Sequence, residues 1–269
     1  MSKGVLLFAF NSPKYNYYEM AVATAKRVNH FLGLPVTIVT DSESLPIKQT
    51  YQFDNVIMAT ADKTNFRDWG MWINKGRYRA YELSPYDETI LLDTDYMINS
   101  DKLLKTFDLP TDFCCHDTTS FLMHPESTQE ALSVHSFNTL WATVVMFRKT
   151  NRAKQIFDCL KMVQNNFEHY ATIHGFISAT FRNDYGLSLA TRIVNGHTVC
   201  KKDIIPWNLL HVGKNTTVYR NNDSEINTEY TVLFDNWSRG KVRKEYLTIK
   251  DTDFHVMTKE NFMELITYE

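Results

Sequence analysis

Long apolar runs are missing from this chain of 269 residues. A membrane-spanning helix needs about 20 consecutive apolar residues, and no stretch of the sequence approaches that length. The apolar run VLLFAF that begins at Val5 is followed at once by the turn-forming sequence Asn11-Ser12-Pro13, so we expect a strand there and neither a signal peptide nor a span. These absences favour a protein of the cytoplasm, or of the host cytoplasm if a phage encodes it.

Glycine is also scarce, with 9 residues, and the glycine-rich phosphate motifs are absent. Without GxGxxG a dinucleotide-binding Rossmann site is not expected, and neither a P-loop nor a GxSxG sequence is present. The 4 cysteines include no CxxC pair, so no zinc-finger pattern exists. We interpret Cys114, Cys115, Cys159 and Cys200 as reduced, buried thiols, with a metal site at Cys114, Cys115 and His116 as the alternative.

No charge of one sign dominates. Lys plus Arg number 29 and Asp plus Glu number 31, whereas nucleic-acid coats and polybasic membrane binders carry a clear positive excess. One segment is basic, through Arg239, Lys241, Arg243 and Lys244. That segment is typical of a solvated hairpin, and a phosphate-binding patch is the alternative interpretation.

What is present is an alternation of apolar strands and amphipathic helices. Continuous apolar runs such as GVLLFAF are typical of strands buried on both faces of a parallel sheet. The order of elements over residues 1–95 predicts an α/β fold with an open, mostly parallel sheet and crossover helices on its faces. No repeat or linker divides the chain, so we expect one domain over 1–269. The predicted strands are 4–10, 35–41, 53–60, 88–95, 139–149, 228–237 and 253–258. The predicted helices are 15–33, one within 69–87 that stops before Pro85, 151–170 and 183–196.

Two carboxylates stand one residue apart at the end of the fourth predicted strand, in ETILLDTDYM. Asp93 and Asp95 repel each other unless a cation lies between them or water reaches both. Hard cations such as Mg²⁺ and Mn²⁺ prefer oxygen ligands, and Mg²⁺ sites commonly combine one or two carboxylates with substrate phosphate oxygens. The pair therefore predicts a divalent-metal site that holds a diphosphate, with a solvated acidic loop as the alternative.

Other polar residues are expected near this pair. Open parallel sheets bind ligands beyond the carboxyl ends of their strands, where Asn11, Asp41 and the two aspartates are all predicted to lie. We expect Asn11 and Asp41 to bind a base and a ribose. His255 is either a structural histidine or a further metal ligand, and Lys259 provides a positive charge for a phosphate.

The stretch RAYELSPYDETILLDTDYMI (79–98) resembles the corresponding region of glycosyltransferases with the GT-A fold, above all the glycogenin-like retaining sugar transferases. Their pattern is a helix with Lys or Arg, then Leu-x-Pro-Tyr-Asp, then an apolar strand that ends in Asp-x-Asp. The resemblance implies a GT-A fold with a nucleotide-binding half (1–100) and an acceptor-binding half (101–269). It also implies retaining transfer of a hexose or pentose from a nucleoside-diphosphate sugar, most simply a UDP-sugar.

The same resemblance implies roles for individual residues. Asp93, Asp95 and His255 would bind Mn²⁺ (or Mg²⁺), and Asp184 would be the catalytic residue beside the transferred sugar. The residues implied to bind the donor are Ala9, Phe10, Asn11, Asp41, Lys75, Arg79, Asp93 and Lys259.

Alternatives to a transferase are also compatible with the sequence. A haloacid-dehalogenase-like phosphatase would use Asp93 as its nucleophile, although that motif belongs on the first strand and here follows three others. A non-catalytic sugar-nucleotide binder would use the same residues without transfer. For a transferase, the acceptor is an intracellular glycan, a protein or, as in phage enzymes, a hydroxymethylated DNA base, so nucleic acid is one candidate partner.

Overall fold

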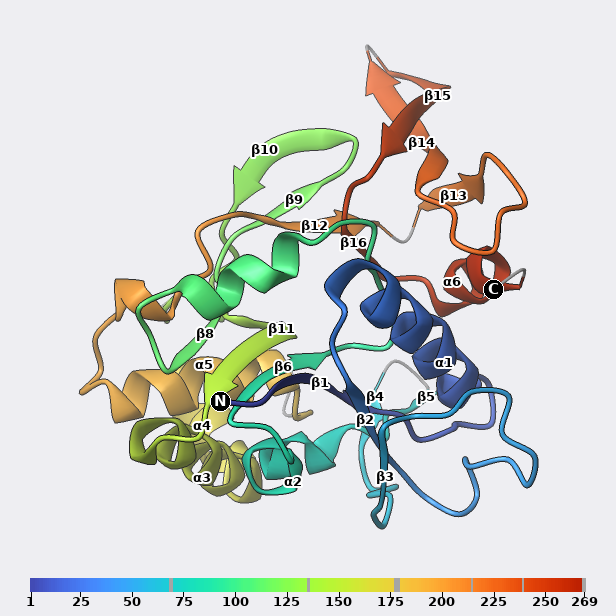
Figure 1. Ribbon diagram of the computed structural model, residues 1–269. Helices are drawn as coiled ribbons and strands as arrows, with labels where there is room; N and C mark the ends of the chain where they lie inside the picture. The colour runs from blue at the N-terminus through green and yellow to red at the C-terminus, as the bar shows by residue number, and fades with distance from the viewer. Residues whose placement is uncertain (68–69, 135, 177–179, 214, 239, 268–269) are drawn as a thin grey trace.

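A six-stranded sheet in the order β3-β2-β1-β6-β11-β8 forms the centre of the fold (Figure 1). The computed structural model describes residues 1–67, 70–134, 136–176, 180–213, 215–238 and 240–267. The first four strands of the sheet run parallel, whereas β11 is antiparallel to both of its neighbours. The strands are β1 (Lys3–Phe8), β2 (Val36–Thr40), β3 (Asn55–Met58), β6 (Glu88–Leu92), β8 (Phe113–His116) and β11 (Trp141–Arg148).

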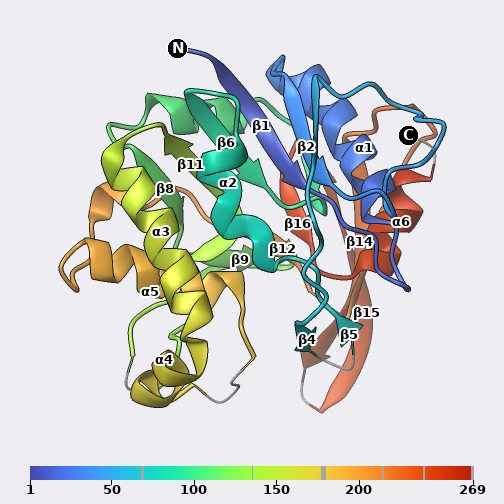
Figure 2. The same cartoon turned by 90° about the horizontal axis from the view of Figure 1, so that it is seen from below.

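Helices cover both faces of this sheet (Figures 1 and 2). Alternate residues of the strands point to opposite faces, so Leu7 and Ile90 join one hydrophobic core and Leu6 and Leu91 join the other. The mostly parallel sheet between helical layers, which the sequence predicts and the resemblance to GT-A enzymes implies, is therefore confirmed. On one face lie α1 (Tyr17–Arg27), its π-helical continuation (Val28–Leu32) and η3 (Lys102–Asp108), and on the other lie α2 (Ala80–Leu83), α3 (Asn151–Asn165), α4 (Phe167–His174) and α5 (Asn183–Val194).

A second sheet, in the order β10-β9-β12-β16-β7, lies beyond one end of the central sheet. Its strands come from the middle and the end of the chain, and they bury a third core together with α6 (Lys259–Ile266). This sheet matters for function because it carries C-terminal residues to the end of β6. Its strands are β7 (Tyr96–Met97), β9 (Thr119–Phe121), β10 (His124–Thr128), β12 (Leu209–Val212) and β16 (Phe254–Val256).

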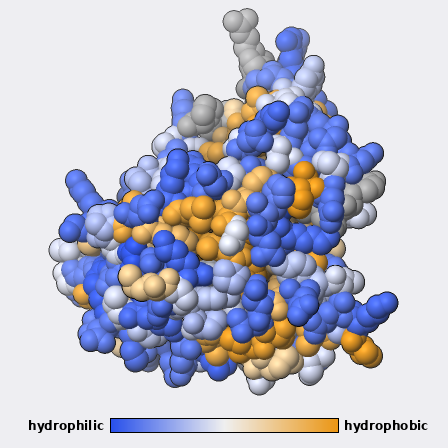
Figure 3. All heavy atoms as spheres, in the orientation of Figure 1, coloured by the Kyte–Doolittle hydropathy of each residue, from blue (hydrophilic) through white to orange (hydrophobic). Residues whose placement is uncertain are grey.

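The basic segment forms part of a long hairpin, as the sequence predicts. Strand β14 (Glu229–Ser238) pairs with β15 (Lys241–Lys250), and β13 (Thr216–Arg220) completes a three-stranded sheet. The hairpin projects from the body of the molecule (Figure 1), and its projecting end is largely hydrophilic in Figure 3. The predicted basic residue Arg239 lies outside the described residues.

Two predicted helices are wrong in extent. The helix expected in the segment 69–87 stops before Pro85 as predicted, but it consists only of η2 (Lys75–Arg79) and α2. The described part before η2 includes strand β5 (Gly70–Met71), paired with β4 (Phe66–Arg67). Residue 69 itself lies outside the described residues. The helix expected over 151–170 breaks at Asn166, whose φ of −120° ends α3 before α4 begins.

The cysteines behave as expected for reduced thiols. Cys114, Cys115 and Cys159 are buried and Cys200 is partly buried, and none forms a disulfide. Burial raises the pKa of Cys114 to about 12, so this thiol stays protonated and is a poor metal ligand. Within the described residues, no metal-binding cluster includes the two adjacent cysteines, and none of the helices is long and apolar enough to cross a membrane.

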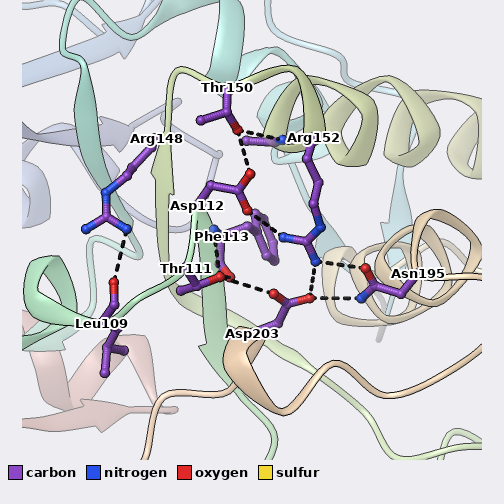
Figure 4. Close-up of polar contacts among 10 residues, drawn as sticks. Leu109, Thr111, Asp112, Phe113, Arg148, Thr150, Arg152, Asn195 and Asp203 are labelled. Atoms are coloured by element: carbon purple, nitrogen blue, oxygen red, sulfur yellow. Dashed lines mark hydrogen bonds and ion pairs between the residues drawn. The ribbon is translucent and has the colours of Figure 1, made fainter.

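An ion-pair network joins α3 to the end of the sheet opposite the carboxyl end of β6 (Figure 4). The guanidinium of Arg152 binds Asp112 and Asp203, each at 2.5 Å, and Asn195 at 2.8 Å. The carboxylate of Asp203 also accepts hydrogen bonds from Thr111 and Asn195. The carboxylates and the guanidinium satisfy one another, so the network acts as a structural connection among α3, β8 and the η4 turn (Lys201–Asp203).

Candidate metal and donor site

The Asp-x-Asp pair lies on a tight turn directly after β6. The backbone N–H of Asp93 donates to the Thr143 carbonyl of β11 at 2.9 Å, and the N–H of Tyr96 donates back to the Asp93 carbonyl at 3.3 Å. The turn closed by the second bond follows the end of the strand at Leu92, so the predicted strand 88–95 is too long at its carboxyl end. Asp95 is only 3% exposed, which excludes the solvated-loop alternative for this residue.

Strand β16 brings His255 to the same place. It pairs antiparallel with β7, with His255 opposite Tyr96, and the Val256 N–H donates to the Asp95 carbonyl at 3.1 Å. The Nε2 atom of His255 lies 3.2 Å from Oδ2 of Asp95. One ligand atom each from Asp93, Asp95 and His255 lies within 4.8 Å of the others. Two carboxylates and one imidazole at this separation fit a divalent cation of the first transition row or Mg²⁺.

Two cationic side chains contact the carboxylates. The guanidinium of Arg77 binds Oδ1 of Asp93 and donates to the Ala142 carbonyl at 2.9 Å, and it is 6% exposed. The ammonium group of Lys259, at the first residue of α6, binds Oδ2 of Asp95. These contacts offset the repulsion between the two carboxylates in the absence of a metal ion.

Arg77 is the site residue that sequence reasoning missed. The predicted donor contacts in this segment are Lys75 and Arg79, and the ammonium group of Lys75 instead donates to Oγ1 of Thr64 at 2.9 Å. Basic residues at 75, 77 and 79 alternate, so the sequence contains the right signal without indicating which of the three turns inward. The donor-binding roles of Lys75 and Arg79 stay predictions.

Two buried histidines, His255 and His211, lie beside the Asp93–Asp95 pair. Burial lowers the pKa of His255, while the nearby carboxylates of Asp93 and Asp184 raise it in part. The neutral imidazole is the form that binds metal ions, so the fold favours the competent form near neutral pH. On its inner side, Nδ1 of His255 lies 3.0 Å from Nδ1 of His211, whose pKa burial lowers to about 2.

Asp184, the predicted catalytic residue, lies in the first turn of α5 and faces the same region. Its Oδ1 accepts the Ala142 N–H at 3.0 Å, and its Oδ2 binds Arg182 at 3.0 Å. The peptide groups on either side of Ala142 thus connect Asp184 to Arg77, and through Arg77 to Asp93. The carboxylate is therefore fixed in place next to the candidate metal site, and its catalytic role stays a prediction.

The predicted base and ribose contacts lie at neighbouring strand ends and are connected to each other. Asn11 follows β1, and its Oδ1 accepts the N–H of Tyr18 in the first turn of α1 at 2.9 Å. The N–H of Asn11 donates to Oγ of Ser44 at 2.7 Å, and the N–H of Ser44 donates to Asp41 at 2.8 Å. Because β1, β2 and β6 run parallel, these residues share the sheet edge at which Asp93 emerges.

A cavity of about 520 Å³ opens at this edge, which is a suitable size for a ligand. Ala9 and Phe10 are buried, and the Ala9 N–H and carbonyl are bonded to Val39 and Thr40, so any donor contact of these two residues stays a prediction. The cavity is lined by Asp41, Ser42, Glu43, Met58, Ala59, Thr60, Ala61 and Lys63. A larger cavity of about 600 Å³ lies at the opposite end of the sheet, beside the ion-pair network, and contains none of the predicted site residues.

Comparisons with known proteins give distant structural neighbours. No protein-family model and no curated protein match this chain. The glycosyltransferase GlyE of Streptococcus pneumoniae TIGR4 is 13% identical with a TM-score of 0.44, over 71% of this chain and 44% of GlyE. The apo form of mouse xyloside xylosyltransferase 1 is 11% identical with a TM-score of 0.43, over 73% of this chain and 83% of the mouse protein. This chain thus spans less than half the length of GlyE, and the functional proposal below is supported by the site residues alone.

Proposed function

We propose that this protein is a metal-dependent glycosyltransferase that moves a sugar from a nucleoside-diphosphate sugar to an acceptor. The observation that supports this most directly is the convergence of Asp93, Asp95 and His255 within 4.8 Å, although His255 is 160 residues from Asp95 in the sequence. We further propose Mn²⁺ or Mg²⁺ as the cation, a UDP-sugar as the donor and retention as the outcome. Residues 1–100 would bind the nucleotide, and 101–269 would bind the acceptor as well as supplying His255 and Lys259.

The charges of the site suit a metal bound together with a diphosphate. The two carboxylates are balanced by Arg77 and Lys259, so the cluster is close to neutral without metal. A divalent cation adds two positive charges, and the diphosphate of the donor supplies the matching negative charge. When bound, the cation stabilises the charge that develops on the departing diphosphate. When the two carboxylates bind the cation, Arg77 and Lys259 would pair with phosphate oxygens of the donor in place of Asp93 and Asp95.

We therefore expect Mn²⁺ and UDP to bind cooperatively. Mn²⁺ alone must compete with Arg77 and Lys259, whereas Mn²⁺ with UDP gives these cations new anionic partners. The affinity for Mn²⁺, measured by isothermal titration calorimetry, should rise by at least about tenfold when UDP is present, which corresponds to ~1.4 kcal/mol of coupling. Inorganic sulfate at the same concentration serves as the control anion. Equal Mn²⁺ affinity with and without UDP would contradict the proposed donor site.

Release of free UDP from UDP-sugars separates the transferase from the alternatives. A transferase releases UDP in proportion to sugar transferred, and a non-catalytic binder releases none. A phosphatase that uses Asp93 would instead release inorganic phosphate from phosphorylated substrates without a sugar nucleotide. The assay should include a panel of glycan, peptide and DNA acceptors. If the protein binds UDP-sugar and Mn²⁺ but releases no UDP with any of them, it is a non-catalytic sugar-nucleotide binder.

We propose that Asp184 lies beside the transferred sugar or the acceptor hydroxyl. Asp184→Asn keeps the shape and the contact with the Ala142 N–H, but it removes the negative charge paired with Arg182. Transfer should slow by about 100-fold or more, the usual scale for losing a positioned catalytic group, while UDP binding stays nearly unchanged. Turnover and calorimetry on the same preparations test this, and parallel loss of UDP binding would make Asp184 a structural or donor-binding residue.

For a nucleic-acid acceptor, the hairpin β14–β15 is the feature to test. Strand β15 exposes Lys241, Arg243 and Lys244, although Asp235 lies opposite Lys244 and reduces the positive charge. Phosphate contacts by such residues make binding strongly dependent on salt. We propose that DNA, glycan and protein acceptors be compared in the UDP-release assay. If transfer to DNA falls steeply as the salt concentration rises, the hairpin is supported as the surface that contacts DNA.

A further inference from the structure

The inner nitrogen of His255 is in hydrogen-bond contact with a second buried histidine. Parallel pairing of β12 with β16 places His211 directly beside His255, and the two Nδ1 atoms are 3.0 Å apart. His211 is 1% exposed and His255 is 9% exposed, so water does not compete for this contact. The outer nitrogen of His255, Nε2, belongs to the cluster formed with Asp93 and Asp95.

A hydrogen bond between two Nδ1 atoms ties together the protonation states of the two rings. One Nδ1 must carry a proton and the other must offer a lone pair. If His255 is protonated on Nε2, this group donates a hydrogen bond to Asp95 at 3.2 Å, and Nδ1 accepts a hydrogen bond from Nδ1–H of His211. If the lone pair of His255 is on Nε2, where a metal ion needs it, Nδ1 carries the proton and His211 must accept.

The surroundings hold His211 in one orientation. Strand β12 is paired on both sides, with β9 and with β16. The imidazole of His211 packs against Trp141, with 4.9 Å between ring centroids, and against Phe121 at 6.1 Å. Its Nε2 has no hydrogen-bond partner among the described residues, so the Nδ1 contact with His255 is the one that orients the ring.

We propose that His211 is a positioning residue that orients the ring of His255 and accepts the hydrogen bond of its Nδ1 when Nε2 carries the metal ion. This inference rests on the proposed metal site. With a metal ion on Nε2 of His255, the shared proton would lie on Nδ1 of His255 and His211 would carry its own proton on Nε2, so each ring would hold one proton.

Two substitutions separate hydrogen bonding from packing. His211→Leu removes the acceptor and keeps an apolar side chain, whereas His211→Asn retains an oxygen close to the position of Nδ1. His116→Leu is the matched control, because His116 is a fully buried histidine whose ring nitrogens have no hydrogen-bond partner among the described residues. With UDP present, His211→Leu should lower the affinity for Mn²⁺ by about 10–100-fold, the usual effect of losing the partner of a metal-binding histidine. His211→Asn and His116→Leu should stay within about threefold of the wild type.

A second measurement does not depend on metal affinity. Long-range ¹⁵N NMR of the metal-free protein reports the tautomer of each histidine, and diamagnetic Mg²⁺ with UDP reports the change on binding. We expect one tautomer of His255 in the wild type, a switch on addition of Mg²⁺ with UDP, and a mixture of tautomers in His211→Leu. If the wild type binds no Mn²⁺ even with UDP, the proposed function fails. If it binds and His211→Leu binds equally well, or if His255 has the same tautomer in both proteins, the role of His211 is overturned.

Discussion

Asp95→Asn is expected to reduce sugar transfer by at least about 1,000-fold, because it removes a charge that the metal ion and its diphosphate require. Asp95 is the most buried of the three candidate ligands, and its Oδ2 contacts both His255 and Lys259. Asparagine keeps the shape and one acceptor oxygen, so the turn after β6 is retained. Alanine is less suitable, since it would leave the nearly buried ammonium of Lys259 without this carboxylate.

Turnover by UDP release, Mn²⁺ affinity by calorimetry and thermal unfolding by circular dichroism should be measured on the same protein. Asp158→Asn is the control, because Asp158 is exposed on α3 and pairs only with Lys154 among the contacts described. It should keep full activity. EDTA should stop the wild type, and Mn²⁺ should restore it. Full activity of Asp95→Asn with Mn²⁺, or turnover unaffected by EDTA, would exclude the metal site.

Burial of His116 and His211 is expected to lower the free energy of unfolding by on the order of 5 kcal/mol between pH 6.5 and pH 4.5. Burial lowers the pKa of His116 to about 3 and that of His211 to about 2, from an ordinary value of 6.5. Between those folded values and 6.5, the unfolded chain binds two protons that the folded chain does not. Stability is therefore complete above pH 6.5 and is lost as the pH falls, at about 1.4 kcal/mol per pH unit for each histidine.

Urea unfolding at pH 7.5, 6.5, 5.5 and 4.5 measures this dependence. Carboxylates also titrate in this range, so the informative comparison is with His116→Leu, which removes one of the two histidines without touching the candidate ligands. Between pH 7.5 and pH 4.5, the part of the free energy of unfolding that is lost through histidine protonation should be about half as large in this variant as in the wild type. An identical pH dependence in the variant and the wild type would show that His116 is protonated, or accessible to protons, in the folded state.

Local patterns in the sequence were sufficient for the central sheet. Continuous apolar runs such as the one at Val5 can be buried only between two layers, and β1, β2 and β6 lie where these runs predict them. The helices were predicted less well, because apolar spacing alone shows neither that the helix within 69–87 begins only at Lys75 nor that Asn166 ends the one expected over 151–170. Asp93 and Asp95 were recognisable because both follow such a run, and a strand end positions its neighbours without help from distant residues.

Only the tertiary structure decided what surrounds the two aspartates. His255 and Lys259 were linked to them through a family resemblance, and no local pattern places residues 160 and 164 positions away beside Asp95. Arg77, and neither Lys75 nor Arg79, contacts Asp93 because its side of η2 faces the end of β6. The contact between His211 and His255 exists because β12 and β16, 44 residues apart at this point, pair in one register. Strand register is set by the summed packing of whole faces, so a single sequence determines the strand ends but not which distant side chains meet there.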